Sequence, residues 1–319
     1  MKEYNLDRNT MICGIMVTYY PTRQTIENIR IAKQQLDCFV LIDNTPTHVD
    51  FSLLNDLGIF DLSEAKPRFP MTPNMYSVIL LRNHSNLGLS KAFNLGISIA
   101  KSLEVDYILL LDQDSKLHND TIEKLFRSYT ALLNYEVGAL GCTNIQYGAP
   151  LPAQSTSPRL QPKEYVESAL YQEVYLKENS GLLIPIIVIN KVGKFNEAFF
   201  LDGVDYDFCL RLREYGYKVF RAKQAFITQS AGTESNVRLF GKTFKYIIRD
   251  PKRTHSIVES YVMLLKIHNS SRGILMVKFA LDFVLLNFRI IFLYKDKRKH
   301  FTQMLGGLIK GLTSEISES

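Results

Sequence analysis

The sequence predicts an α/β protein with a mostly parallel, open sheet flanked by helices, followed by a helical C-terminal extension. Short apolar runs alternate with segments of helical periodicity through the first half of the 319-residue chain, and this alternation is typical of parallel sheets. The last quarter holds long apolar stretches interrupted by basic residues. We therefore divide the chain into a first unit, residues 1–240, and an extension, residues 241–319.

The elements of the first unit follow from its apolar runs and their flanking residues. Strands are predicted at residues 12–18, 39–42, 78–81, 107–111, 137–142, 182–188 and 219–227. Helices are predicted at residues 90–101, 121–134 and 206–215, and after a cap at Thr22 or Thr25. A strand, a helix and a strand joined by short links form a right-handed parallel crossover. The polar segment Pro150–Pro162 is predicted to be a loop over a cleft.

Composition and charge narrow the class of protein. The four cysteines lie far apart, without metal-ligand or redox spacing, which indicates reduced thiols in a cytoplasmic protein. Residues 241–319 hold 14 Lys and Arg against 6 Asp and Glu, a net charge of +8, whereas residues 1–240 carry −2. Because this basic extension is also strongly apolar, the pattern favours contact with a membrane surface over binding to nucleic acid.

The apolar run 274–294 in the extension is long enough to raise the question of a membrane span. Lys278, Asp282 and Arg289 interrupt it and fall within an arc of about 40° on a helix of 3.6 residues per turn. A spanning helix would bury all three charges at a considerable energetic cost. We therefore expect a helix that docks on a membrane surface or packs against protein, and an interface in a homo-oligomer also fits.

Two acidic residues follow directly after the predicted strand 107–111. Asp112 and Asp114 stand one residue apart, at the strand end where α/β folds bind ligands. Hard oxygen ligands of this kind suit Mg²⁺ or Mn²⁺, and those ions usually bring a phosphate group with them. A solvated turn fits the same residues, because Asp and Ser favour turns.

A second acidic cluster, Asp202, Asp205 and Asp207, precedes and opens the helix predicted at 206–215. Acidic residues at a helix N-terminus are favoured by the macrodipole, and Asp207 can pair with Arg211 four residues later. For Asp207 we expect this structural role. For Asp205 the helix N-terminus predicts a lowered pKa, whereas a general base works best with a pKa near neutrality.

A glycine-containing segment, residues 86–96, opens the helix predicted at 90–101. It matches neither the P-loop nor the G-x-G-x-x-G pattern, so the nucleotide triphosphatase and dinucleotide-binding classes lack their main support. Gly88 allows close backbone approach, and the helix start offers free N–H groups to an anion. A loop that only needs the dihedral freedom of glycine fits equally well.

Several short sequence blocks follow one another along residues 10–235, and their order is informative. They are Val17-Thr18-Tyr19-Tyr20-Pro21, Asp43-Asn44, residues 86–96, Leu111-Asp112-Gln113-Asp114-Ser115, Asn179-Ser180-Gly181 and residues 199–211. In this order the blocks resemble the family 2 glycosyltransferases of the GT-A fold, within them the rhamnosyltransferase-like branch. The resemblance implies an inverting enzyme that transfers L-rhamnose from dTDP-L-rhamnose to a hydroxyl of a glycan or glycolipid acceptor. It also implies bacterial surface polysaccharide synthesis at the inner face of the cytoplasmic membrane.

The same resemblance assigns roles by position. Residues that would line the nucleotide-sugar pocket are Thr18, Tyr20, Pro21, Asp43, Asn86, Gly88, Lys91, Asp112 and Gln113. Asp114, together with Asp112, would hold a divalent cation, Mg²⁺ or Mn²⁺, on the donor diphosphate, and Asp205 would be the general base. One position departs from the family: Gln229 stands where a histidine is usual, and an amide oxygen is a weaker metal ligand than imidazole.

Three alternatives stay open at this point. A UDP-hexose-dependent enzyme of the same fold fits, because the sequence does not reveal the contacts of the donor sugar. A metal-dependent phosphohydrolase or nucleotidyltransferase that uses Asp112 and Asp114 predicts phosphate release without an acceptor. An inactive sugar-nucleotide binder, which Gln229 would allow, predicts donor binding without turnover.

Overall fold

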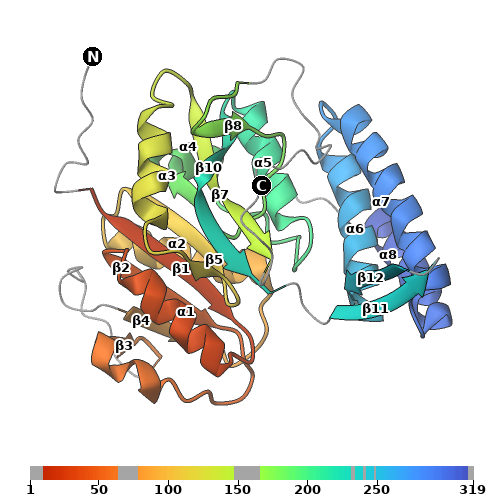
Figure 1. Cartoon of the computed structure of the whole chain (residues 1–319), viewed down its shortest axis with the longest axis horizontal. Helices are drawn as coiled ribbons and strands as arrows, with labels where there is room; N and C mark the ends of the chain where they lie inside the picture. Colours follow the sequence, from red (N-terminus) through yellow and green to blue (C-terminus); the bar gives the residue numbers. More distant parts are fainter. Residues whose placement is uncertain are drawn as a thin grey trace.

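The protein is described by a computed structural model over residues 10–63, 78–146, 166–230, 234–239, 242–247 and 249–314. Within these residues a large sheet has helices on both faces, and three further helices lie beside it (Figure 1). The α/β class predicted from the sequence is confirmed. The predicted loop Pro150–Pro162 lies outside the described residues.

The described part of the large sheet has ten strands. They are β1 (Ile12–Thr18), β2 (Cys38–Asp43), β3 (Ile59–Asp61), β4 (Val78–Arg82), β5 (Tyr107–Asp112), β6 (Lys116–Leu117), β7 (Val137–Gln146), β8 (Tyr171–Glu173), β9 (Leu182–Pro185) and β10 (Lys218–Gln229). Their order is β3-β4-β2-β1-β5-β9-β7-β10-β6, and β8 pairs with β10. The five neighbouring strands β3, β4, β2, β1 and β5 are parallel to one another, as are β7 and β10. Because β9 runs antiparallel between β5 and β7, the sheet is mixed.

Helices cover each face of the sheet. One face carries α1 (Arg23–Lys33) and α3 (Thr121–Thr130), and the other carries α2 (Leu89–Ser102), α4 (Ile186–Val192) and α5 (Val204–Glu214). A short 3₁₀ helix, η1 (Ser52–Leu57), follows β2. Helix α1 begins as predicted, because Thr22 and Thr25 each accept a hydrogen bond from the other's backbone N–H in a capping box.

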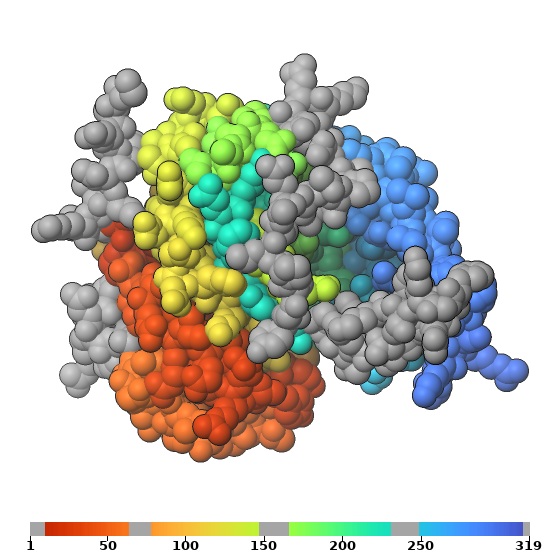
Figure 2. All heavy atoms as spheres, viewed as in Figure 1, coloured from red at the N-terminus to blue at the C-terminus, as the bar shows by residue number. Residues whose placement is uncertain are grey.

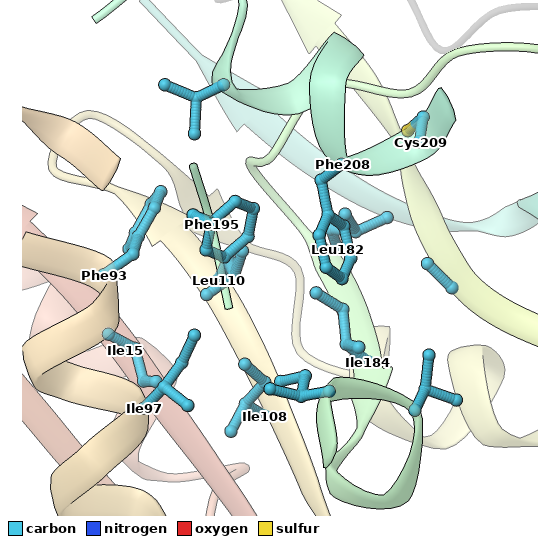
Figure 3. Packing of buried hydrophobic residues seen from close by; sticks show 14 of the residues in the cluster. Ile15, Phe93, Ile97, Ile108, Leu110, Leu182, Ile184, Phe195, Phe208 and Cys209 are labelled. Atoms are coloured by element: carbon cyan, nitrogen blue, oxygen red, sulfur yellow. The ribbon is translucent and has the colours of Figure 1, made fainter. Parts of the chain in front are cut away.

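Alternating side chains of β5 divide the apolar core into two layers. Ile108 and Leu110 pack with the helices α2 and α5, whereas Leu109 and Leu111 face α1 and α3. Figure 3 shows the first layer, where Phe195 lies between Phe93 and Phe208, with ring centroids 5.5 and 4.7 Å away. The central strand is therefore covered on both faces, and its carboxyl end is held in a fixed position.

The C-terminal part holds α6 (Pro251–Ile267), α7 (Arg272–Phe292) and α8 (Lys297–Thr313), preceded by a hairpin of β11 (Glu234–Leu239) and β12 (Lys242–Ile247). These helices form one side of the molecule (blue in Figure 2). Helix α8 lies close to α6 because it presents glycine there: a Cβ on Gly311 would lie 2.7 Å from Cβ of Val262. No described helix is long and apolar enough to cross a membrane.

Several boundaries differ from the sequence prediction, and β7, for example, extends four residues beyond the predicted end at 142. The run 182–188, predicted as one strand, is β9 followed by α4, because the chain turns at Pro185. An apolar run does not by itself distinguish a strand from a buried helix, and proline, which has no N–H, tends to end a strand and precede a helix. Helix α3 ends at Thr130, four residues before the predicted end.

Candidate active site

The parallel strands β1, β2 and β5 end together at one edge of the sheet. In the observed register Thr18 of β1 lies beside Asp43 of β2, and Val17 of β1 lies beside Asp112 of β5. This is the edge at which open α/β sheets bind ligands. The fold therefore places the acidic strand ends predicted from the sequence next to one another.

A cavity of about 590 Å³ opens at this edge. The sequence-predicted residues in its lining are the acidic pair Asp112 and Asp114, the intervening Gln113, and Asp205 at the start of α5. Further lining residues are Val17, Leu89, Glu178, Asn179, Leu201, Asp202, Gly203, Tyr206, Gln229, Arg249, Arg253, Ile257 and Tyr261. The structure thus brings the predicted metal ligands and the predicted base into one cavity.

The acidic pair carries unfavourable negative charge. Burial raises the pKa of Asp112 to about 6, and the neighbouring Asp114 adds to this, whereas a hydrogen bond from Gln229 and the charges of Lys177 and Arg253 oppose it. Burial also raises the pKa of Asp114. Two confined carboxylates repel each other, and a bound cation removes that repulsion.

The residues present fit a hard divalent cation. Within the described residues, no hydrogen bond reaches the buried oxygens Asn179 Oδ1 and Asp202 Oδ2, and both residues line the cavity. Buried oxygens without a donor often indicate a missing water or ion. The described residues contain no group of three or more His, Cys, Asp or Glu that could hold a metal ion. The ion would therefore complete its shell with water and donor phosphate oxygens, as Mg²⁺ usually does.

Gln229, at the position for which the resemblance implies a histidine, contacts Asp112 through its nitrogen. Its Nε2 donates to Asp112 Oδ2 at 3.1 Å and to Ser115 Oγ at 3.2 Å. Its Oε1 accepts from Asn144 Nδ2 at 2.8 Å. The amide oxygen therefore points away from the carboxylates, so Gln229 offers Asp112 a hydrogen-bond donor.

Asp205, the predicted general base, has a raised pKa. Burial raises its pKa to about 7, the nearby charge of Glu178 adds to this, and the N–H of Tyr206, which donates to Asp205 Oδ1 at 3.0 Å, opposes it. The lowering expected from the helix N-terminus is outweighed by burial. A carboxylate that titrates near neutrality in a cavity is suited to accept a proton from a substrate hydroxyl.

Asp207 has the structural role predicted for it. Its carboxylate is buried, accepts from Arg211 Nε at 2.9 Å, and lies 3.1 Å from Nε2 of His268. The other ring nitrogen of His268 lies 2.8 Å from the carboxylate of Glu214. Burial alone would lower the pKa of His268, but its hydrogen bonds to Asp207 and Glu214 raise it. This cluster ties α5 to the end of α6, where His268 is the C-cap residue.

Two predicted donor-binding residues of β1 and β2 form a buried pair outside the cavity lining. The Oδ1 atom of Asp43 accepts from the hydroxyl groups of Thr18 at 3.0 Å and Thr45 at 2.7 Å. A nearby residue, Tyr20, has a φ of 49° and is 52% exposed, and Pro21 beside it is half-buried. The nucleotide-binding role of these residues stays a prediction.

The predicted donor residues in the 86–96 segment also lie outside the lining. Gly88 has a φ of 82°, and a Cβ there would lie 2.7 Å from the ring of Phe200. Its N–H donates to Asn86 Oδ1 at 3.1 Å. Lys91 is exposed on the first turn of α2. Glycine at position 88 is thus required by its dihedral angle and by close packing, and anion binding at this helix start remains an expectation.

Sequence reasoning missed the contribution of α6 to the cavity. Arg249, Arg253, Ile257 and Tyr261 line it, although all belong to the extension. Arg249 precedes the helix, and Arg253, Ile257 and Tyr261 recur every four residues along α6. This spacing indicates one helix face and was the available signal. The hydroxyl of Tyr261 donates to Asp282 on α7 at 2.9 Å. The extension therefore completes the site.

Comparisons with known proteins agree with this geometry. The model of the family described as "Glycosyl transferase family 2" matches residues 71–148. The chain is 23% identical to the dTDP-rhamnosyl transferase RfbF of Shigella flexneri, over 96% of this chain and 97% of that protein.

Solved structures show the same fold. The structure of S. aureus TarS 1-349 in complex with UDP-GlcNAc superposes with a TM-score of 0.55 and 14% identity, over 95% of this chain and 81% of that one. The structure of GalNAc-T7 with UDP, GalNAc and Mn²⁺ gives a TM-score of 0.52 and 12% identity, over 82% of this chain and 48% of that one. On these grounds the chain is a glycosyltransferase with the GT-A fold, and it is similar to the family 2, rhamnosyltransferase-like enzymes.

Proposed function

We propose that this enzyme moves L-rhamnose from dTDP-L-rhamnose to a hydroxyl of a lipid-linked or polysaccharide acceptor in bacterial cell-surface glycan synthesis. One observation carries the proposal: the acidic pair Asp112 and Asp114 and the half-buried Asp205 line a single cavity. The choice of donor is supported by the likeness to RfbF, a dTDP-rhamnosyl transferase.

Asp205 is the proposed general base. The acceptor hydroxyl attacks the sugar carbon in line with the departing nucleoside diphosphate, and Asp205 takes the hydroxyl proton as the bond forms. Proton transfer to a positioned side chain contributes about 10²–10⁴-fold to such rates. Because a single attack on the face opposite the leaving group completes the reaction, the configuration at the sugar carbon is inverted.

Asp114 and Asp112 are the proposed holders of Mg²⁺ or Mn²⁺. When bound, the ion supplies positive charge to the diphosphate as negative charge develops on it. Arg253 of α6 and Arg249, which precedes that helix, line the same cavity, and their guanidinium groups suit phosphate oxygens. The divalent-cation cofactor is further supported by the presence of Mn²⁺ in the GalNAc-T7 structure.

A thermal-shift panel tests the donor and the class of reaction together. The protein is heated with Mn²⁺ or Mg²⁺ and dTDP, UDP, GDP or ATP, and each nucleotide is also tested without metal. A ligand at 100 times its Kd adds about 2.7 kcal/mol to the stability of the folded state. Metal-dependent stabilisation by dTDP supports the rhamnosyl donor, and by UDP the alternative hexosyl donor. Stabilisation by ATP alone would favour phosphoryl transfer instead.

We also propose that the enzyme acts on the inner face of the cytoplasmic membrane, with α7 and α8 as its contact surface. Both helices expose apolar side chains along one face, in contrast to the covered sheet. The exposed residues include Val277, Leu281, Val284, Phe288 and Phe292 on α7 and Leu305, Leu308, Ile309 and Leu312 on α8. Lys295 between the helices and Lys297, Arg298 and Lys299 on the first turn of α8 are exposed. Basic groups beside an apolar face favour anionic head groups.

Vesicle sedimentation tests this contact surface. The protein should sediment with phosphatidylglycerol-containing vesicles and less with phosphatidylcholine vesicles, because the basic turn needs anionic lipid. Val284→Glu should reduce binding, since this side chain is 66% exposed on α7. Ile187→Glu is the matched control, because Ile187 is 74% exposed on α4, away from the surface. Elution as a dimer without vesicle binding would show that a second copy covers this face.

A further inference from the structure

Lys177 is a buried cation close to the proposed cation site. Its side chain is 2% exposed, and its stem crosses β7 where residue 141 is glycine: a Cβ on Gly141 would lie 2.6 Å from Lys177 Cγ. Burying an ammonium group is costly, and a positive charge near a metal site opposes metal binding by Coulomb's law. We therefore expect this lysine to have a function that outweighs the cost of burial and the repulsion of a bound metal ion.

A chain of hydrogen bonds runs from Lys177 to the acidic pair. The ammonium donates to Glu178 at 2.8 Å and to Asn144 Oδ1 at 3.4 Å. An ammonium only donates, so Asn144 presents its oxygen to Lys177 and its Nδ2 to Gln229 Oε1. Gln229 is then left with N–H groups for Asp112. Each amide orientation thus follows from the one before it.

We propose that Lys177 and Asn144 are positioning residues that fix the amide of Gln229 as a hydrogen-bond donor to Asp112, so that Gln229 does not ligate the metal. The inference rests on the proposed metal site. The two ends of a glutamine amide are nearly equal in shape, and the reversed amide would set its oxygen against the Asp112 carboxylate. The fixed orientation holds one oxygen of Asp112 and leaves the other for the cation, as outer partners of metal ligands do elsewhere.

The substitution Asn144→Asp distinguishes two roles of Gln229, donor to Asp112 or ligand of the metal, because they predict opposite changes in the strength of Mn²⁺ binding. Aspartate still accepts from Lys177 but cannot donate to Gln229 Oε1, so the proposal expects Mn²⁺ binding in the presence of dTDP to weaken by about 10–100-fold. If the oxygen of Gln229 instead ligates the metal, its Nε2 faces residue 144, and aspartate accepts that bond. Mn²⁺ binding is measured by electron paramagnetic resonance of the free ion. Binding that is unchanged or tighter in the variant would overturn the proposal.

The substitution Lys177→Met provides a second test, again by whether Mn²⁺ binding weakens or tightens. Methionine keeps an unbranched stem in the space opposite Gly141 and removes the charge, which by Coulomb's law alone would tighten Mn²⁺ binding. The proposal expects binding about tenfold weaker, because Asn144 loses the donor that orients it. Unchanged or tighter binding would contradict it. Lys223→Met, which removes a lysine that pairs with Glu167 outside the cavity lining, is the control and should leave Mn²⁺ binding unchanged.

The wild-type protein separates failure of this inference from failure of the metal site. Absence of Mn²⁺ binding to wild-type protein with dTDP would overturn both. Wild-type binding that Asn144→Asp and Lys177→Met leave intact would overturn the positioning role alone. Thermal melting of each variant without metal shows whether the fold is retained, so that a loss of binding is assigned to the site.

Discussion

The two walls of the cavity use the same side chain, aspartate, in different surroundings. On the sheet wall, Asp112 accepts from Gln229 at 3.1 Å, and the charges of Lys177 and Arg253 help to keep its pKa near 6 in spite of burial. On the helical wall, Asp205 accepts from the N–H of Tyr206, and the charge of Glu178 adds to the effect of burial, so its pKa is near 7.

This difference indicates how one cavity can hold a metal and a base. A carboxylate with hydrogen-bond donors and cations nearby loses its proton more readily and is available to a cation. A carboxylate whose charge is opposed by burial and by neighbouring acids has its pKa raised towards neutrality, which suits proton transfer. Gln229, Lys177 and Arg253 lower the pKa of Asp112, whereas Glu178 raises that of Asp205. Substitution of Asp205 tests whether this difference separates the two roles.

The largest expected effect is on turnover by Asp205→Asn. Asparagine cannot accept the acceptor proton, so the rate should fall by about 10²–10⁴-fold. Donor binding should persist, because the acidic pair is intact. Both are measured by donor turnover and by calorimetric titration with donor and Mn²⁺. Asp120→Asn, at an exposed acid that pairs with Lys124, is the control, and turnover retained in Asp205→Asn would disprove the base assignment.

The pH dependence of the rate should follow the titration of Asp205 on the helical wall. Because the pKa of Asp205 is near 7, its carboxylate is ionised above that pH and progressively protonated below it. The rate should therefore fall about tenfold per pH unit below pH 7 and level off above it. A rate that stays constant between pH 5 and pH 7 would show that a group with a lower pKa accepts the proton.

Asp205→Asn should also stabilise the fold at high pH. The pKa of Asp205 is about 7 in the folded protein and about 3.9 when unfolded. Protonated Asp205 therefore favours folding below pH 4, and this contribution is lost as pH rises through 7. At pH 8 the variant should be more stable by up to about 4 kcal/mol, at about 1.36 kcal/mol per pKa unit, and at pH 4 by little. Urea denaturation at both pH values measures this, and a destabilised variant at pH 8 would show that ionised Asp205 is well solvated.

The smallest effect is expected at His268, which contacts the structural aspartate, Asp207. The hydrogen bonds of its imidazole to Asp207 and Glu214 raise its pKa against the effect of burial. The stabilisation is complete below the unfolded pKa of about 6.5 and is lost as pH rises through the higher folded value. His268→Gln should destabilise the fold by about 1–3 kcal/mol at pH 6 and by less at pH 9. An equal loss at both pH values would mean that the imidazole is neutral.

The sequence predicted the sheet wall better than the helical wall. The strand at 107–111 and the pair Asp112 and Asp114 are one local pattern, so their position at a sheet edge was predictable. Tyr261 and Arg253 lie on a helix in the extension, and only the three-dimensional packing brings them to Asp205. The raised pKa of Asp205 depends on that packing, so a reading of its helix N-terminus alone gave the opposite direction.

The identity of the product tests the central claim most directly. Wild-type enzyme, Mn²⁺, dTDP-L-rhamnose and a lipid-linked glycan acceptor are incubated together, and nuclear magnetic resonance gives the configuration at the transferred carbon. The proposed roles of Asp114 and Asp205 predict a new glycosidic bond with the configuration inverted relative to the donor, formed only with metal and lost in Asp205→Asn. Retained configuration, or release of inorganic phosphate without a glycosidic product, would contradict this account.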